Sequence, residues 1–445
     1  MKQQCLVLLL LLLCASMVGC SPGHSGSNEI AFIRDGHLWT IDPDGANAFD
    51  VAADSTPIAS YGWSPNHQLL VFRTLDASFA KSSAAKQIVS NPITQVPGDL
   101  PSTISTIGID GGSPIPIIPS SPDVLESSAW WNASGNRLLY REELNQATPG
   151  ANTTLWWISQ NDQPNGIARK LLPSSFSIPS LDYHDALALG NADHGIFTTT
   201  LAGTDQRYVV RGELPGHPLP ATLERVLWQP AHPHPGILYA LTESSPQIQP
   251  FNAPTPQLQL VLRAMDGHTT HLTTCACTQF AWAPDGNHIL YSTGPTYTIL
   301  TINGNTAFTF TAEDGSIPYW SPDSRFLLLD GLHTLTLIQV ASEHQQVLLS
   351  DASGPPATTS SPDLSVKAPL QPASNSLWAA DSSHFLFLTR GRILWQGKAL
   401  SSGKGLYTVT LDTHGLPQSA PSVVDTGNDI QAGWTYEDPN TSFLF

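Results

Sequence analysis

Cys275 and Cys277 are separated by a single residue and are the residues of this chain best suited to thiol chemistry. Two cysteines at this spacing can form a small disulfide in an oxidising compartment, or both can stay reduced. His268 and His271 lie just upstream, so a Cys/His metal cluster is a third reading, although the spacing fits no zinc pattern. We name Cys275 and Cys277 as a candidate disulfide and predict no metal site.

Two groups of histidines have side chains that could move a proton or bind a metal. His232 and His234 form one group, and His184 with Asp182 and Asp185 forms the other. Both groups fall in expected turns. We therefore assign neither group a catalytic or metal-binding role.

Glu142 and Glu143 are neighbours, so on a strand their side chains would point to opposite faces. Such a pair cannot share one substrate as acid and base. The tandem aromatics Trp130-Trp131 and Trp156-Trp157 should divide in the same way, with one ring of each pair in the core. The sequence thus predicts no catalytic residue and no cofactor.

The start of the chain has the pattern of a secretory signal, with Lys2 followed by an apolar run from Cys5 to Ala15. This run is shorter than the roughly 20 residues that a membrane-spanning helix needs. The small residues directly before Cys20 resemble a bacterial lipobox, which implies cleavage after Gly19 and acylation of Cys20. Met17 replaces the usual leucine of that motif, so a plain signal peptide cut near Gly19 is the alternative.

These features divide the chain into a lipoprotein signal peptide (1–19), a flexible tether (20–29) and a single domain (30–445). The lipid on Cys20 would hold the protein on the extracytoplasmic side of the cell membrane. Cys5 and Cys14 would leave with the signal peptide. The acidic body would not adhere to an anionic membrane, so it needs such an anchor.

The composition excludes several classes of protein. The chain has 445 residues, of which 41% are apolar, which is enough to bury a core and argues against disorder. Only 12% are charged, and 37 Pro and 33 Gly disfavour long solvent-facing helices. The net charge of -17 would repel a nucleic acid, so we predict no nucleic-acid partner.

Most of the chain repeats one pattern: an apolar strand ending in Trp, a Ser/Ala-Pro-Asp/Asn turn, a second strand, and a later pair of strands joined at a Gly turn. Pro fixes one turn residue and a following Gly can be left-handed, which closes a hairpin. The turns follow Trp63, Trp131, Trp228, Trp282, Trp320, Trp378 and Trp434, with a degenerate copy near Tyr183. Four antiparallel strands per copy predict an all-β fold, a β-propeller of eight or possibly seven four-stranded blades.

The turn at Trp320–Asp323, the strand Ile289–Tyr291 and the later Asp-Gly turns resemble the WD40-like repeat of TolB-type β-propellers. The resemblance implies a propeller fold and an extracytoplasmic setting, but no single activity. The repeats begin at Ile30, which leaves no room for the separate N-terminal domain of TolB. Propeller peptidases have similar repeats, but the Gly-x-Ser-x-Gly motif of their hydrolase domain does not occur in this sequence.

The turns of such a blade divide between two faces of the ring. The turns between the first and second strands and between the third and fourth strands share one face, which we call the tight-turn face. The other connections share the opposite face, which we call the long-loop face. The long connections are 76–100, 142–152, 243–256, 351–376 and 390–405. We expect all of them on the long-loop face, which is the candidate binding surface. The alternative is that these Pro- and Ser-rich connections are solvated and have no function.

Both ends of the chain should share one blade, with Ile30–Ile33 beside the strand that ends in Trp434. One short strand expected from the sequence then belongs to none of the four-stranded blades. The sequence predicts a non-catalytic, lipid-anchored binding or scaffold module for a protein or glycan of the cell envelope. The alternatives are a propeller hydrolase or lyase with its active site in the central channel, and a sensor of a small ligand.

Overall fold

A computed structural model provides the structure of the chain. It describes residues 29–55, 57–83, 85, 100–121, 123–132, 134–144, 154–160, 169–173, 180–181, 186–191, 195–200, 207–210, 221–230, 235–243, 257–351, 370–371, 376–400, 405–427 and 429–435. The predicted signal peptide and Cys20 lie outside these residues. The described part is almost entirely β-strand, with one short 3-10 helix, η1 (Phe79–Lys81).

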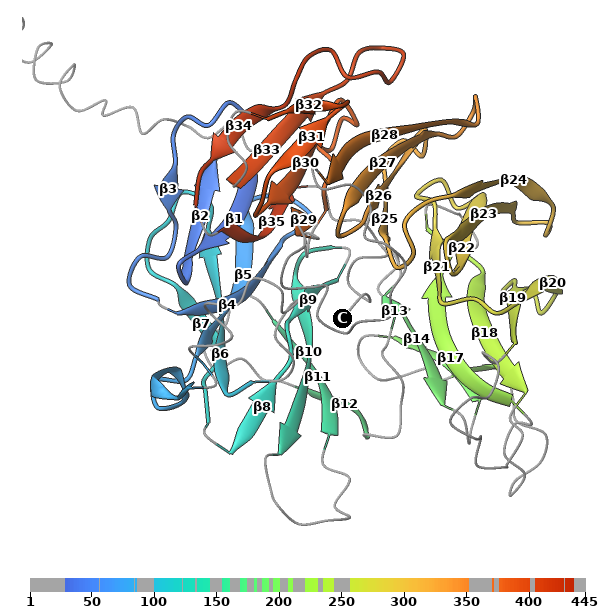
Figure 1. Cartoon of the computed structure of the whole chain (residues 1–445). Helices are drawn as coiled ribbons and strands as arrows, with labels where there is room; N and C mark the ends of the chain where they lie inside the picture. The colour runs from blue at the N-terminus through green and yellow to red at the C-terminus, as the bar shows by residue number, and fades with distance from the viewer. Residues whose placement is uncertain are drawn as a thin grey trace, which may run out of the picture.

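The described strands form eight antiparallel sheets around a common centre (Figure 1), and we name these sheets blades A to H. Blade A contains β35 (Asp429–Trp434), β1 (Ile30–Arg34), β2 (His37–Ile41) and β3 (Phe49–Asp50). Blade B contains β4 (Ile58–Trp63), β5 (Leu69–Leu75), β6 (Ser102–Gly108) and β7 (Ile115–Ile118). Blade C contains β8 (Val124–Glu126), β9 (Trp130–Trp131), β10 (Arg137–Leu144), β11 (Thr154–Gln160) and β12 (Arg169–Pro173).

The remaining blades follow in chain order. Blade D contains β13 (Ser180–Leu181), β14 (Ala186–Asn191), β15 (Gly195–Thr200) and β16 (Arg207–Val210). Blade E contains β17 (Ala221–Trp228), β18 (Ile237–Glu243), β19 (Leu258–Arg263) and β20 (Thr269–Cys275). Blade F contains β21 (Gln279–Trp282), β22 (His288–Thr293), β23 (Thr296–Thr301) and β24 (Thr306–Thr311).

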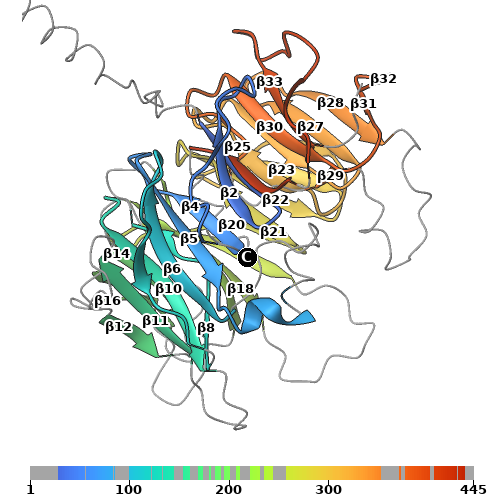
Figure 2. The same ribbon diagram turned by 90° about the vertical axis from the view of Figure 1, so that its left-hand side faces the viewer.

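Blades G and H are linked by an inserted hairpin. Blade G contains β25 (Ile317–Trp320), β26 (Phe326–Asp330), β27 (Thr334–Gln339) and β28 (His344–Asp351). Blade H contains β29 (Leu370–Gln371), β30 (His384–Thr389), β33 (Gly405–Thr410) and β34 (Ser422–Asp425). The insert is β31 (Ile393–Trp395) and β32 (Lys398–Ala399), and β31 pairs with the outer strand β28 of blade G. The hairpin lies beside β28 (Figure 2), and together with β9 it gives the described sheets three strands more than four per blade, where the sequence left one strand without a place.

These sheets confirm the predicted fold, an all-β propeller with antiparallel blades, mostly of four strands. The second strand of blade G shows how a blade packs on either side of such a strand, because β26 is buried along its whole length. Trp378 shows how neighbouring blades fit together. Its ring stacks on Phe326 with centroids 6.0 Å apart, and its Nε1 donates to the main-chain oxygen of Tyr319 at 2.9 Å. Trp378, which precedes the turn of blade H, thus packs on the preceding blade, blade G.

The Ser-Pro-Asp turns form as predicted, and the turn of blade G shows the contacts. The hydroxyl of Ser321 donates to Asp323 at 2.7 Å and accepts the N–H of Phe326 at 2.9 Å. Ser324 takes the left-handed position with φ of 58°, the position that Gly286 holds in the turn of blade F with φ of 67°. Its hydroxyl accepts the N–H of Asp285 in blade F at 2.9 Å, so this serine also joins two blades.

Blade A is assembled from both ends of the chain, as predicted. Ile30 of β1 is the register partner of Trp434 in β35, and Arg34 is the partner of Asp429. The pairing leaves no open sheet edge between the first and last strands of the described chain.

The connections also follow the predicted division between the two faces. Those from β5 to β6, β10 to β11, β18 to β19 and β30 to β33 join second to third strands, and that from β28 to β29 joins a fourth strand to a first. All five therefore leave at the long-loop face. Within the part of the chain that the structure describes, no helix has the length and apolar character needed to span a bilayer.

Candidate functional site

The densest group of buried charges that the structure describes lies between blades B and C, at their long-loop end. β5 and β10 are the second strands of these blades and run toward that end, where they place Arg73 and Glu142. Glu126 is the last residue of β8 and is the register partner of Glu142. Arg73 and Glu126 are each only 1% exposed. We call Arg73, Glu126 and Glu142 the B–C junction.

Glu126 is bound to blade B although its strand belongs to blade C. Its main-chain N–H donates to Leu100 at 2.9 Å, and its main-chain oxygen accepts the N–H of Leu100 at 3.0 Å. Its Oε2 accepts the N–H of Ser102 at 2.8 Å. Both the main chain and the side chain of Glu126 thus fasten the inner edge of blade C to blade B.

Arg73 approaches the same residue from β5. Its Nη1 donates to the main-chain oxygen of Glu126 at 2.5 Å. A buried guanidinium is costly unless it is hydrogen-bonded, and this bond satisfies one of its N–H groups. Removing the Glu126 side chain would leave the buried N–H of Ser102 without this acceptor.

Burial controls the protonation of the junction. It raises the pKa of Glu126 to about 8, and the nearby Glu142 carboxylate acts in the same direction. The N–H of Ser102 and the charge of Arg73 lower this pKa, but by less. Burial also raises the pKa of the Tyr140 hydroxyl, with Glu142 and Glu126 adding to the effect. At neutral pH Glu126 is therefore largely a neutral acid.

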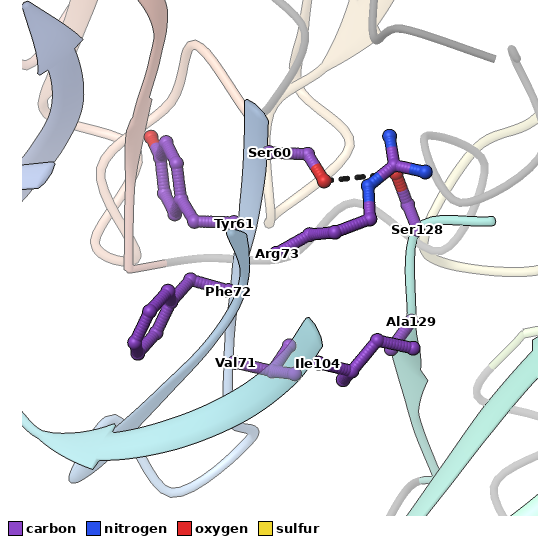
Figure 3. A pocket seen from close by; sticks show the side chains of 8 residues that line it. All are labelled: Ser60, Tyr61, Val71, Phe72, Arg73, Ile104, Ser128 and Ala129. Carbon is purple, nitrogen blue, oxygen red and sulfur yellow. Dashed lines mark hydrogen bonds between the residues drawn. The ribbon is translucent and has the colours of Figure 1, made fainter. Parts of the chain in front are cut away.

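A small cavity borders the junction and is lined by β4, β5, β6 and the chain between β8 and β9 (Figure 3). Its volume of about 10 Å³ fits a single water molecule. Figure 3 shows the Arg73 side chain reaching toward Ser60 and Ser128, whose hydroxyls are 3.1 Å apart. The cavity can hold a water among polar groups, but it is too small for a sugar ring or a peptide side chain.

Glu142 and Glu143 confirm the predicted division of neighbouring strand residues. Glu142 is half-buried and interacts with Glu126, whereas Glu143 is exposed. Neither Glu126 nor Arg73 is predicted as a site residue from the sequence. The signal in the sequence was the charged residue Arg73 inside the apolar run Leu70–Leu75. No neighbouring residue in the sequence explains this charge.

Cys275 and Cys277 are joined as a disulfide, with Cα atoms 5.1 Å apart, which lies in the usual range. Cys275 ends β20 and Cys277 lies on the connection to β21, at the long-loop face. Both cysteines are buried in an apolar cluster with Leu258, Leu272 and Phe280. His271 interacts with Thr274 at 3.2 Å.

The other residues considered from the sequence are only partly described. Trp131 is buried and Trp130 half-buried, as expected for neighbours on a strand. The side chains of Trp156 and Trp157 lie outside the described part of the structure. The histidine groups, His232 with His234 and His184 with Asp182 and Asp185, also lie outside it. Within the described residues, no group of three or more His, Cys, Asp and Glu is placed to hold a metal ion.

Comparison with known proteins finds similarity in fold. No family model matches the chain. No curated protein matches it either. The crystal structure of a eukaryotic initiation factor is 10% identical, with a TM-score of 0.50 over 92% of this chain and 99% of that one.

Two further solved structures are less similar. An oligogalacturonate lyase in complex with manganese is 10% identical, with a TM-score of 0.44 over 66% of this chain and 79% of that one. A protein described as TolB from Agrobacterium tumefaciens is 14% identical, with a TM-score of 0.33 over 67% and 83%. At these identities the likeness concerns the fold alone. The chain is a β-propeller, as its sheet topology shows and the likeness to the initiation factor supports.

Proposed function

We propose that this protein is a lipid-anchored, extracytoplasmic β-propeller that binds a protein or glycan of the cell envelope through its long-loop face. The observation that carries the proposal is the placement of the long connections. All five leave the same face of a ring whose first and last strands are paired. A rigid scaffold that presents several long loops on one face is a common arrangement for recognition.

The described part of the long-loop face favours binding over catalysis. Its most distinctive polar group, the B–C junction, is almost fully buried and borders a cavity the size of one water. A general acid must reach the proton acceptor on a substrate, and Glu126 instead accepts the N–H of Ser102 in the neighbouring blade. The geometry gives the junction a role in fastening two blades together.

Photo-crosslinking on intact cells tests the binding face. A crosslinking amino acid would replace Thr296, which is exposed at the long-loop end of blade F, or Thr306, which is exposed at its tight-turn end. We expect captured material from position 296 and none above background from position 306. Mass spectrometry would separate a protein partner from a glycan. Capture from position 306 alone would contradict the proposal, and a small-ligand sensor would give no covalent partner from either site.

The lipid anchor is tested separately. Cys20→Ala should move the protein from the membrane fraction to the soluble extracytoplasmic fraction. The released protein should keep its unfolding midpoint, since residue 20 lies outside the propeller domain. Retention of this variant in the membrane fraction would show that another anchor holds the protein.

A further inference from the structure

We infer that the tight-turn face of the propeller lies toward the membrane and that the long-loop face points away from it. The inference rests on the proposed acylation of Cys20. It follows from where the chain enters the fold and from how far the residues between Cys20 and Glu29 can reach.

The chain enters the ring at the tight-turn face. β1 is the second strand of blade A, and a second strand starts at the first-to-second turn and runs to the long-loop end. Its first residue, Ile30, pairs with Trp434, the residue that ends the inner strand. Glu29 and Ile30 are 3% and 0% exposed, so the chain is held by the fold up to this point.

The distance available to the anchor is limited by covalent geometry. Residues 20–28 are nine residues, and at no more than about 3.6 Å per residue they span at most about 32 Å in any conformation. The acyl chains on Cys20 must therefore enter the bilayer within about 32 Å of the tight-turn end of β1.

The long-loop face is too far away along the outside of the blade. β2 and β3 lie outside β1, which adds about 10 Å at 4.8 Å per strand. The height of a blade adds about 23 Å, taking the seven residues of β5 at 3.3 Å each. This path of about 33 Å exceeds the reach before the rim side chains or the long connections are counted.

A path through the centre of the ring is shorter, but it also fails to let the anchor insert with the long-loop face toward the membrane. One strand spacing and one blade height require about 28 Å, which leaves Cys20 about level with the opposite mouth. The blades bear five long connections at that end, because the strands on either side of each connection end there. The tight-turn face is thus the face that can approach the membrane when the anchor is inserted.

The charge of the tight-turn face keeps this approach from becoming adhesion. Aspartates recur in its turns: Asp42, Asp44, Asp110, Asp266, Asp285, Asp323, Asp381 and Asp412. N–H groups of Leu416 and His414 lower the pKa of Asp412. Burial opposes the ionisation of Asp381, but hydrogen bonds from Ser383 outweigh it and lower the pKa of Asp381. The lowered pKa values of Asp381 and Asp412 favour their ionised forms, and an acidic face of this kind would be repelled by anionic lipids.

Energy transfer to a labelled membrane tests the orientation. T296C and T306C form a matched pair, because both replace an exposed threonine in blade F, at opposite ends. Each acylated variant would carry a donor dye at the new cysteine and bind vesicles of phosphatidylcholine and phosphatidylglycerol that contain an acceptor lipid. We expect higher transfer from position 306 than from position 296.

The outcomes separate the orientation from the anchor. Equal transfer from the two positions, or higher transfer from position 296, would overturn the orientation while the acylated protein stays on the vesicles. Failure of the protein to bind vesicles at all would overturn the anchor, and the orientation with it. The difference between the two positions should vanish when Cys20→Ala is added to each variant.

Discussion

Arg34 donates from Nη1 to both carboxylate oxygens of Asp425, at 2.8 and 2.7 Å, although 391 positions separate the two residues. Arg34 lies in β1 of blade A, and Asp425 ends β34 of blade H. The guanidinium also lies 4.3 Å from the centre of the Trp39 ring. This pair joins the start of the described chain to its last complete blade.

We expect Asp425→Asn to lower the free energy of unfolding by about 1 kcal/mol, because the pair is partly buried and its loss leaves the guanidinium without its carboxylate. Denaturant unfolding with a double-mutant cycle on Arg34 would measure the coupling. The exposed pair Arg325–Asp323 is the control. Arg325→Gln should change stability by less than about 0.5 kcal/mol. An equal loss in both variants would argue against a special role for the Arg34–Asp425 contact.

Closure of blade A by both ends predicts a large effect of a small deletion. Removing residues 429–445 deletes β35 and exposes the edge of β1. We expect this truncated protein to lose its cooperative thermal transition. A shorter truncation of residues 436–445 keeps β35 and should melt as the full chain does. Cooperative unfolding of the longer truncation at an unchanged midpoint would refute closure.

The B–C junction should make stability depend on pH. Glu126 has a pKa of about 8 in the folded protein and about 4.5 when unfolded, so the folded state binds more protons between these values. The contribution of Glu126 to the free energy of unfolding therefore falls as the pH rises from 4.5 to 8. It is constant below and above that range.

Glu126→Gln removes this titration and preserves an oxygen that can accept the N–H of Ser102. We expect the variant to match the natural protein at pH 5 and to exceed it by about 2 kcal/mol at pH 9, after allowance for solvent near the junction. Urea unfolding at the two pH values would measure the difference. Glu143→Gln is the matched control and should show no such change. A constant difference between Glu126→Gln and the natural protein at both pH values would contradict the assignment.

The Cys275–Cys277 disulfide closes a loop of only three residues, so it restricts the unfolded chain little. Replacing both cysteines by alanine should cost no more than about 2 kcal/mol and leave the fold intact. Thiol labelling of the denatured protein should detect no free thiol at these positions before reduction and two after it. Labelling of both without reduction would show that the protein carries them as thiols.

The features that could be predicted from the sequence are local ones. A Trp-terminated strand, a Ser-Pro-Asp turn and a second strand lie within about a dozen residues, and each turn has its own hydrogen bonds, as Ser321 shows. The order of such units also decides which connections share a face. Closure of blade A followed from incomplete units at the two ends.

The features that were missed depend on contacts between blades. Arg73 meets Glu126 across 53 positions, and no pattern near either residue specifies the partner. β31 belongs to a connection of blade H but pairs with blade G, so its partner could not be found from the repeat. Ser324 holds a left-handed turn position without glycine, and its hydroxyl accepts the N–H of Asp285 in blade F. Such contacts are set by packing rather than by local propensity.

The hairpin of β31 and β32 has a consequence for how the ring comes apart. Trp395 of blade H pairs with Leu349 of blade G, and its ring stacks on Phe387 with centroids 6.4 Å apart. Blade H cannot open without freeing the outer strand of its neighbour. These two blades should therefore exchange their amide hydrogens as one cooperative unit, slower than blades that meet only face to face.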